Sequence, residues 1–89
     1  MTKKQKREHI EALKAIIESN NFKLDNYGNY KLENNNNVYR IKVKKINIRI
    51  ERQALICGKK EWFKLVSNPI VKIEPIALNK YLIALKGRK

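Results

Sequence analysis

The alternation of apolar and basic residues across residues 39–50 constrains the fold of this chain more than any other feature. Period-two alternation is typical of a strand with one buried face. The parity of the alternation changes at Lys44-Lys45, so a continuous regular strand cannot keep one buried face across this point. The apolar positions are Tyr39, Ile41 and Val43 before the change, and Ile46, Ile48 and Ile50 after it.

Two structures are consistent with this change of parity. A two-residue turn at Lys44-Lys45 gives a hairpin, although Lys-Lys is a poor sequence for such a turn. The second structure is one long strand with a bulge at the same point. Both send the apolar residues to the core and the basic residues outward. The hairpin would pair Val43 with Ile46, Ile41 with Ile48, Tyr39 with Ile50, Lys42 with Asn47, and Arg40 with Arg49.

A first helix is predicted over residues 3–19. Thr2 and Gln5 have the spacing of a capping box, and apolar residues follow them at helical intervals. The first turns carry several cations, which is the unfavourable sign for the helix dipole. Either this end frays or an anion lies against it. These cations are Lys3, Lys4, Lys6 and Arg7.

Further strand and helix signals fill the rest of the chain. Residues 22–24 and 30–32 predict a hairpin in which Leu24 faces Tyr30 and the apolar residues share one side, with Gly28 in the loop. Pro75 predicts the start of a second helix, which Gly87 ends. The other predicted segments are a polar connection at 34–37, a loop over 53–60, strands over 61–66 and 70–74, and a turn at 67–69.

The order of these elements predicts an α+β fold in two layers. An N-terminal helix, a meandering antiparallel sheet of about five or six short strands and a C-terminal helix follow one another. The helices would cover the apolar face of the sheet and leave its other face free. The length predicts a single small basic domain over residues 1–89, with residues 1–7 and 87–89 as flexible basic ends.

The charge balance predicts a polyanionic partner. The chain has 21 Lys plus Arg against 8 Asp plus Glu, a formal net charge of +13. AT-rich codons explain the abundance of lysine, but they do not explain the shortage of glutamate. The expected partner is therefore nucleic acid, RNA or DNA, or a nucleoprotein complex. The two alternatives are an acidic protein surface and a charge with no specific partner.

Basic residues of the alternating segment are the first candidates for nucleic-acid binding. Trp62 and Lys64 join them if Phe63 and Leu65 face the core. Trp62 or Tyr27 could stack on an unpaired base, although packing at the core or its rim also accounts for a lone tryptophan. The candidate residues are Arg40, Lys42, Lys44, Lys45, Arg49, Trp62 and Lys64 on the sheet, with Lys3, Lys4 and Arg7 on the first helix.

Catalytic and metal-binding patterns are missing from the sequence. His9 lies among charges and is expected to be an ordinary surface residue, and Asp25 lies in a hairpin loop. Cys57, the one cysteine, has no partner for an internal disulfide and is expected to be a small buried or loop residue. We therefore expect no enzymatic activity, no metal and no cofactor.

The helix, meander, helix order is similar to double-stranded RNA-binding domains and to the HicA-type toxin ribonucleases that share their fold. The similarity covers the first half, where an amphipathic helix runs into Asn20-Asn21-Phe22 and a glycine-containing hairpin. HicA-type toxins carry a catalytic histidine in a Gly-Ser-His-like context, whereas this chain has Gly28-Asn29-Tyr30. The ribonuclease activity therefore does not carry over to this sequence.

Three functions follow from these observations. The first is a non-enzymatic protein that binds nucleic acid or a ribonucleoprotein through an exposed sheet face. The second is a small inhibitor or adaptor, of the kind that phages encode, which binds an acidic cleft or nucleic-acid channel of a protein. The third is a structural subunit of a ribosome-like or virion particle. We expect a cytoplasmic protein without a membrane partner, and the sequence leaves its oligomeric state open.

Overall fold

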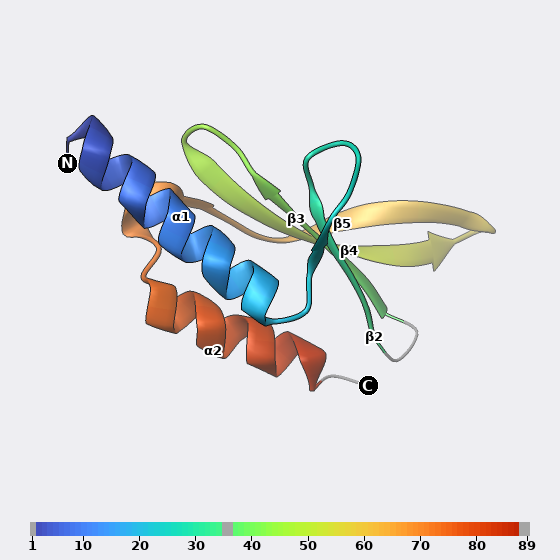
Figure 1. Cartoon of the computed structure of the whole chain (residues 1–89). Helices are drawn as coiled ribbons and strands as arrows, with labels where there is room; N and C mark the ends of the chain where they lie inside the picture. The colour runs from blue at the N-terminus through green and yellow to red at the C-terminus, as the bar shows by residue number, and fades with distance from the viewer. Residues whose placement is uncertain (1, 35–36, 88–89) are drawn as a thin grey trace.

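A computed structural model describes residues 2–34 and 37–87 of the chain. It shows an α+β arrangement in which two helices cover one face of a five-stranded antiparallel sheet, as predicted (Figure 1). The strands follow one another in the sheet in chain order. The elements are α1 (Lys3–Ser19), β1 (Lys23–Leu24), β2 (Tyr30–Asn34), β3 (Asn37–Val43), β4 (Asn47–Ile56), β5 (Lys59–Pro69), the 3-10 helix η1 (Ile70–Lys72) and α2 (Pro75–Lys86).

The capping box predicted at the start of α1 is present. The hydroxyl oxygen of Thr2 accepts a hydrogen bond from the Gln5 N–H at 3.1 Å, and the Gln5 side chain accepts one from the Thr2 N–H at 3.0 Å. Because α1 begins at Lys3, most of the predicted flexible end at residues 1–7 is helical. Gly87, the first residue of the predicted C-terminal end, caps α2, and residues 1 and 88–89 lie outside the described residues.

The core lies between the helices and the inner face of the sheet. Tyr30 faces the core and lies opposite Leu24, as predicted, but Leu24 is 60% exposed because it belongs to a short strand at the sheet edge. The buried apolar residues are Leu13 and Ile17 of α1, Phe22, Tyr30, Tyr39, Ile41, Ile48, Ile50, Ile70, and Leu78, Leu82 and Leu85 of α2.

Of the two alternatives at Lys44-Lys45, the structure has the hairpin and not the bulged strand, and its register is shifted by two residues from the one predicted for a hairpin. Ile41 lies opposite Ile50 and Arg40 opposite Glu51, so the predicted Arg40–Arg49 pair is wrong. The reason is the loop, because Ile46 belongs to the connection and the Lys44 N–H donates to the Asn47 carbonyl at 2.9 Å. Ile46 is 71% exposed, which corrects the prediction that it faces the core.

The β4–β5 hairpin is longer than predicted. Residues 53–60 were expected to form a loop, but β4 continues to Ile56 and β5 begins at Lys59. The turn is Cys57-Gly58, with φ of 51° and 80°, the positive values that a two-residue type I′ turn requires. Beyond the pair of Val38 with Gln53, no β3 residue accompanies β4, so a two-stranded ribbon projects past the helices (Figure 1).

The sheet ends differently from the prediction at two further places. The predicted strand at 70–74 and turn at 67–69 are wrong, because β5 runs without interruption to Pro69 and η1 follows it. At 34–37, Asn34 pairs with Asn37, so the strands reach into the predicted connection, whose residues 35 and 36 lie outside the described residues. Strand β5 forms one edge of the sheet and carries a bulge opposite Ile50/Glu51.

Candidate nucleic-acid interface

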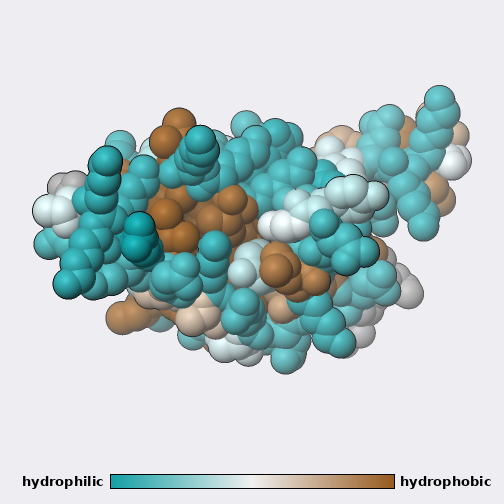
Figure 2. Space-filling view, turned by 45° about the horizontal axis from the view of Figure 1, so that its top comes forward, coloured by the Kyte–Doolittle hydropathy of each residue, from teal (hydrophilic) through white to brown (hydrophobic). Residues whose placement is uncertain are grey.

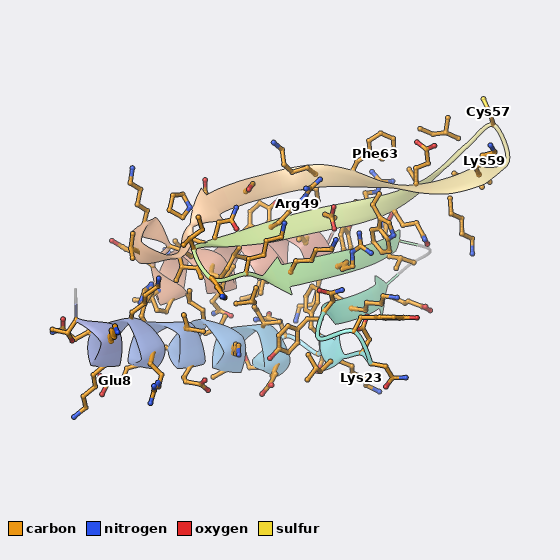
Figure 3. The ribbon with its side chains drawn as sticks, turned by 90° about the horizontal axis from the view of Figure 1, so that it is seen from above. Glu8, Lys23, Arg49, Cys57, Lys59 and Phe63 are labelled. Atoms are coloured by element: carbon orange, nitrogen blue, oxygen red, sulfur yellow. The ribbon has the colours of Figure 1, made fainter. Side chains whose placement is uncertain are left out.

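Basic side chains gather on the sheet face that the helices leave open. Direct cross-strand partners form one row through all five strands: Lys23, Lys31, Arg40, Glu51 and Lys64. In the neighbouring row, Lys42 lies opposite Arg49. Figure 3 looks onto this face, with Arg49 on the near side and α2 behind the sheet. We define the cationic face as Lys23, Lys31, Arg40, Lys42, Arg49, Glu51, Trp62 and Lys64.

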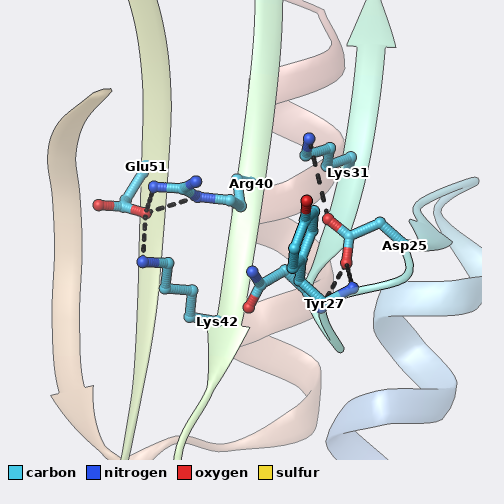
Figure 4. Close-up of polar contacts among 7 residues, drawn as sticks. Asp25, Tyr27, Lys31, Arg40, Lys42 and Glu51 are labelled. Atoms are coloured by element: carbon cyan, nitrogen blue, oxygen red, sulfur yellow. Dashed lines mark hydrogen bonds and ion pairs between the residues drawn. The ribbon is translucent and has the colours of Figure 1, made fainter. Parts of the chain in front are cut away.

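A buried carboxylate lies at the centre of the cationic face. The side chain of Glu51 is 4% exposed, and its Oε1 accepts a hydrogen bond from Arg40 Nε at 2.9 Å and forms an ion pair with Arg40 Nη2 at 2.7 Å (Figure 4). Arg49 Nε lies 3.0 Å from Oε2, and Lys42 Nζ lies 3.9 Å from Oε1. One carboxylate therefore holds three cations, which leaves this cluster with an excess of positive charge.

The Arg40 side chain makes its contacts within the protein and is largely inaccessible to a ligand. Its guanidinium carbon lies 4.0 Å from the centre of the Trp62 ring, a cation–π geometry. Its side chain is only 17% exposed, because it contacts both the Glu51 carboxylate and the Trp62 ring. Trp62 is half-buried as a result. We therefore assign Arg40 to positioning the tryptophan and neutralising the buried acid.

The other cations of the face are available to solvent. The side chains of Lys31, Arg49 and Lys42 are 45%, 37% and 31% exposed, and Lys23 and Lys64 are also exposed. Three cross-strand pairs on this face join like charges: Lys23 with Lys31, Lys31 with Arg40, and Lys42 with Arg49. Such pairs oppose folding by roughly a few tenths of a kcal/mol each. The folded chain thus retains repulsion that an anion placed across the face would remove.

The β1–β2 turn places an exposed tyrosine beside this face. Asp25 Oδ1 accepts hydrogen bonds from the N–H groups of Tyr27 at 2.8 Å and Asn29 at 2.9 Å, and Asp25 Oδ2 lies 3.8 Å from Lys31 Nζ. These bonds fix the backbone of the turn. The ring of Tyr27 is 87% exposed and lies on the same side of the sheet as Lys31 and Arg40 (Figure 4).

The Asp25 turn predicts a stability change in acid. The Asn29 N–H is the main cause that lowers the pKa of the Asp25 carboxyl, partial desolvation opposes it, and the Tyr27 N–H and the charges of Lys31 and Arg40 reinforce it. A carboxyl whose pKa is lowered on folding stabilises the fold above its unfolded pKa of about 3.9. This stabilisation is lost as pH falls further, through the folded pKa. We expect the wild-type melting temperature to fall more steeply than that of Asp25→Asn below about pH 4.

Thermal melts of both proteins from about pH 6 to 2.5, followed by circular dichroism, would test this prediction. Acid also protonates the other carboxylates, which is why the comparison uses the difference between the two proteins. Glu33→Gln, which changes an exposed carboxylate on β2, is the control and should keep the wild-type steepness. Parallel curves for wild type and Asp25→Asn would show that the turn is not held by this charge.

The structure brings together some of the predicted binding residues and separates others. Arg40, Lys42, Arg49, Trp62 and Lys64 share the cationic face, as predicted. Phe63, expected in the core, is instead 43% exposed. Lys44 and Lys45 lie in the β3–β4 loop outside the row, and Lys3, Lys4 and Arg7 lie on α1 in the helical layer.

Three residues of the face were missed by the sequence analysis. Lys31 alternates with Tyr30 and Leu32, so the outward direction of its side chain could have been recognised. Glu51 alternates with Ile50 in the same way, but its position opposite Arg40 depends on the length of the β3–β4 loop. Lys23 could be placed only once the edge strand β1 was known to pair with Lys31.

His9 and Cys57 have ordinary structural surroundings. His9 is half-buried and its Nε2 lies 3.0 Å from the Ile70 carbonyl oxygen, so it links α1 to η1 rather than lying free on the surface. Cys57 is exposed in the hairpin turn. Among the described residues, no group of three His, Cys, Asp or Glu side chains could hold a metal ion.

Neither α1 nor α2, the helices in the described part of the chain, is long and apolar enough to cross a membrane. Comparison of the chain with protein-family models, curated proteins and solved structures finds no match.

Proposed function

We propose that this protein is non-enzymatic and binds nucleic acid, alone or within a ribonucleoprotein, through phosphate contacts on the cationic face. The observation that carries the proposal is the set of three cation–cation pairs across its strands: Lys23–Lys31, Lys31–Arg40 and Lys42–Arg49. A phosphate backbone laid over this face contacts the accessible members of these pairs, which are Lys23, Lys31, Lys42 and Arg49. Binding therefore gains the contacts and also relieves repulsion.

The chemistry of the face favours binding with little dependence on sequence. Its exposed groups are ammonium and guanidinium ions, which contact phosphates regardless of the attached base. Glu51, the carboxylate at the centre of the face, is buried and already paired, so it is not available to read base edges. We therefore expect the affinity to depend strongly on salt and weakly on base composition.

A salt titration tests the proposal directly. Fluorescence anisotropy with labelled 20-mers of random sequence, one RNA and one DNA, should show binding at about 50 mM salt. For about four neutralised phosphates on a single strand, the plot of log K against log salt should have a slope of about −3. Absence of binding to both 20-mers at about 50 mM salt would reject the proposal.

A second candidate function rests on the end of the β4–β5 ribbon. Leu55, Ile56 and Phe63 are 70%, 42% and 43% exposed, and Lys59 and Lys60 flank them. Figure 2 shows apolar side chains among hydrophilic ones where the molecule projects. Apolar side chains ringed by lysines suit an acidic cleft on a protein, as an inhibitor or adaptor would require. This candidate predicts no binding to either 20-mer in the salt titration.

A further inference from the structure

We infer that the cationic face takes single-stranded rather than double-stranded nucleic acid, with bases stacked on Tyr27 and Trp62. This inference rests on the proposed function and names its substrate class. It starts from the position of the two aromatic rings on the same side of the sheet as the row of cations. Phosphate contacts alone would not require an aromatic residue at either end of that row.

Tyr27 has the properties of a preorganised stacking residue. Its ring is 87% exposed, so it contributes almost nothing to the core. The backbone beneath it is nonetheless fixed, because the Asp25 carboxylate accepts two N–H groups of the turn and the Asp25 N–H donates to the Asn29 carbonyl at 2.8 Å. Because the turn backbone is already fixed, only the side-chain torsions of Tyr27 lose freedom when a base stacks on the ring.

Other residues of the cationic face hold the Trp62 ring in position. The Arg40 guanidinium lies 4.0 Å from its ring centre, and Glu51 fixes that guanidinium through a hydrogen bond from Nε and an ion pair with Nη2. The ring is half-buried, so part of it remains accessible. The buried carboxylate thus orients the ring indirectly, which gives Glu51 a positioning role in binding.

The space between the rings suits a short stretch of extended strand. Tyr27 belongs to the β1–β2 turn and Trp62 to β5. The row between them contains Lys31, Arg40 and the buried Glu51, and Lys42 and Arg49 lie in the neighbouring row. Neighbouring strands lie about 4.8 Å apart, so the three steps from β2 to β5 span roughly 14 Å. A backbone crossing the strands would meet cations along this path and present unpaired bases to the rings. In a duplex the faces of the bases are covered by stacking, so the aromatic rings cannot reach them.

Two measurements on the full chain test this inference. The first compares the affinities for a single-stranded 12-mer of RNA, the same sequence as DNA, and a 12-base-pair DNA duplex, at one salt concentration. We expect both single strands to bind more tightly than the duplex. Tyr27→Ala should weaken single-strand binding by about 5- to 150-fold, the range that corresponds to 1–3 kcal/mol per stacked base, and Tyr27→Phe should bind as wild type. Ile46→Ala, which truncates an exposed side chain of another turn, is the matched control.

The second measurement uses Trp62, the only tryptophan of the chain, as a fluorescent reporter. A base stacked on the indole should quench its emission, whereas an inorganic polyphosphate chain bound to the same cations should not. Binding without quenching, a Tyr27→Ala affinity equal to wild type, or a duplex preferred over both single strands would each overturn the inference and leave the proposed function standing. Absence of binding to every nucleic acid would instead reject the proposed function itself.

Discussion

Replacement of Arg40 by glutamate is expected to destabilise the protein by about 3–5 kcal/mol. The substitution removes the hydrogen bond and the ion pair that Glu51 forms with Arg40 and places a second carboxylate beside a side chain that is 4% exposed. Breaking a buried ion pair from one side costs about 3–5 kcal/mol, whereas a chain of this length has a total stability of roughly 4–13 kcal/mol. Each kcal/mol corresponds to about 4–8 °C for a domain of this size, so the melting temperature should fall by at least about 12 °C.

Urea and thermal unfolding followed by far-ultraviolet circular dichroism would measure this loss. Lys42→Ala is the matched control, because Lys42 Nζ lies 3.9 Å from Glu51 and its side chain is 31% exposed, and it should cost less than about 1 kcal/mol. The double variant Arg40→Met with Glu51→Leu should recover most of the stability, since it leaves no buried charge unpaired. A melting temperature of Arg40→Glu within about 2 °C of wild type would show that the pair does not support the fold.

Neutralising three exposed lysines of the cationic face should nearly abolish nucleic-acid binding without harming the fold. The triple variant Lys23→Gln, Lys31→Gln and Lys64→Gln removes one cation each from β1, β2 and β5. At about 1 kcal/mol for each phosphate contact, the affinity should fall on the order of 100-fold, and the salt slope should become shallower by about 2. The melting temperature should stay within a few degrees of wild type, because two like-charge pairs disappear together with the exposed Lys31–Asp25 ion pair.

The control for this prediction has the same net charge. Lys14→Gln, Lys72→Gln and Lys80→Gln change one lysine each on α1, η1 and α2, all in the helical layer. If the cationic face is the binding site, the affinity of this control should stay within about threefold of wild type, apart from a small long-range effect. Equal losses in the two triple variants would mean that net charge, and not this face, causes binding.

The two helices and the fold class were predictable because local signals define them. The capping box at Thr2 and the proline at Pro75 mark the helix starts, and the apolar periodicity indicates which side is buried. The parity change at Lys44-Lys45 located the break in the alternation but did not decide between a hairpin and a bulged strand. The register was not predictable, because it depends on whether Ile46 belongs to the loop or to the strand. The position of Ile46 therefore decides whether Arg40 lies opposite Arg49 or opposite Glu51.

The end of the β4–β5 ribbon escaped prediction for a different physical reason. Periodicity appears only where one side of a strand is buried, and the ribbon beyond Gln53 has both sides in solvent. Leu55 and Ile56 are consecutive apolar residues and are both exposed, so they give no alternating signal. The Cys57-Gly58 turn lacks the usual asparagine before the glycine, which further hid the hairpin.

The free edge of β5 has a consequence for how copies of the protein behave when a polyanion is present. An uncovered edge strand of 11 residues is a template for pairing with another chain, and Lys59, Lys60 and Lys64 oppose this pairing by electrostatic repulsion. A nucleic acid that neutralises the face also weakens the repulsion between neighbouring copies on the same strand. Binding of nucleic acid therefore lowers the resistance of the protein to self-association. Copies of the protein should approach one another most closely when many of them are bound to one long nucleic-acid chain.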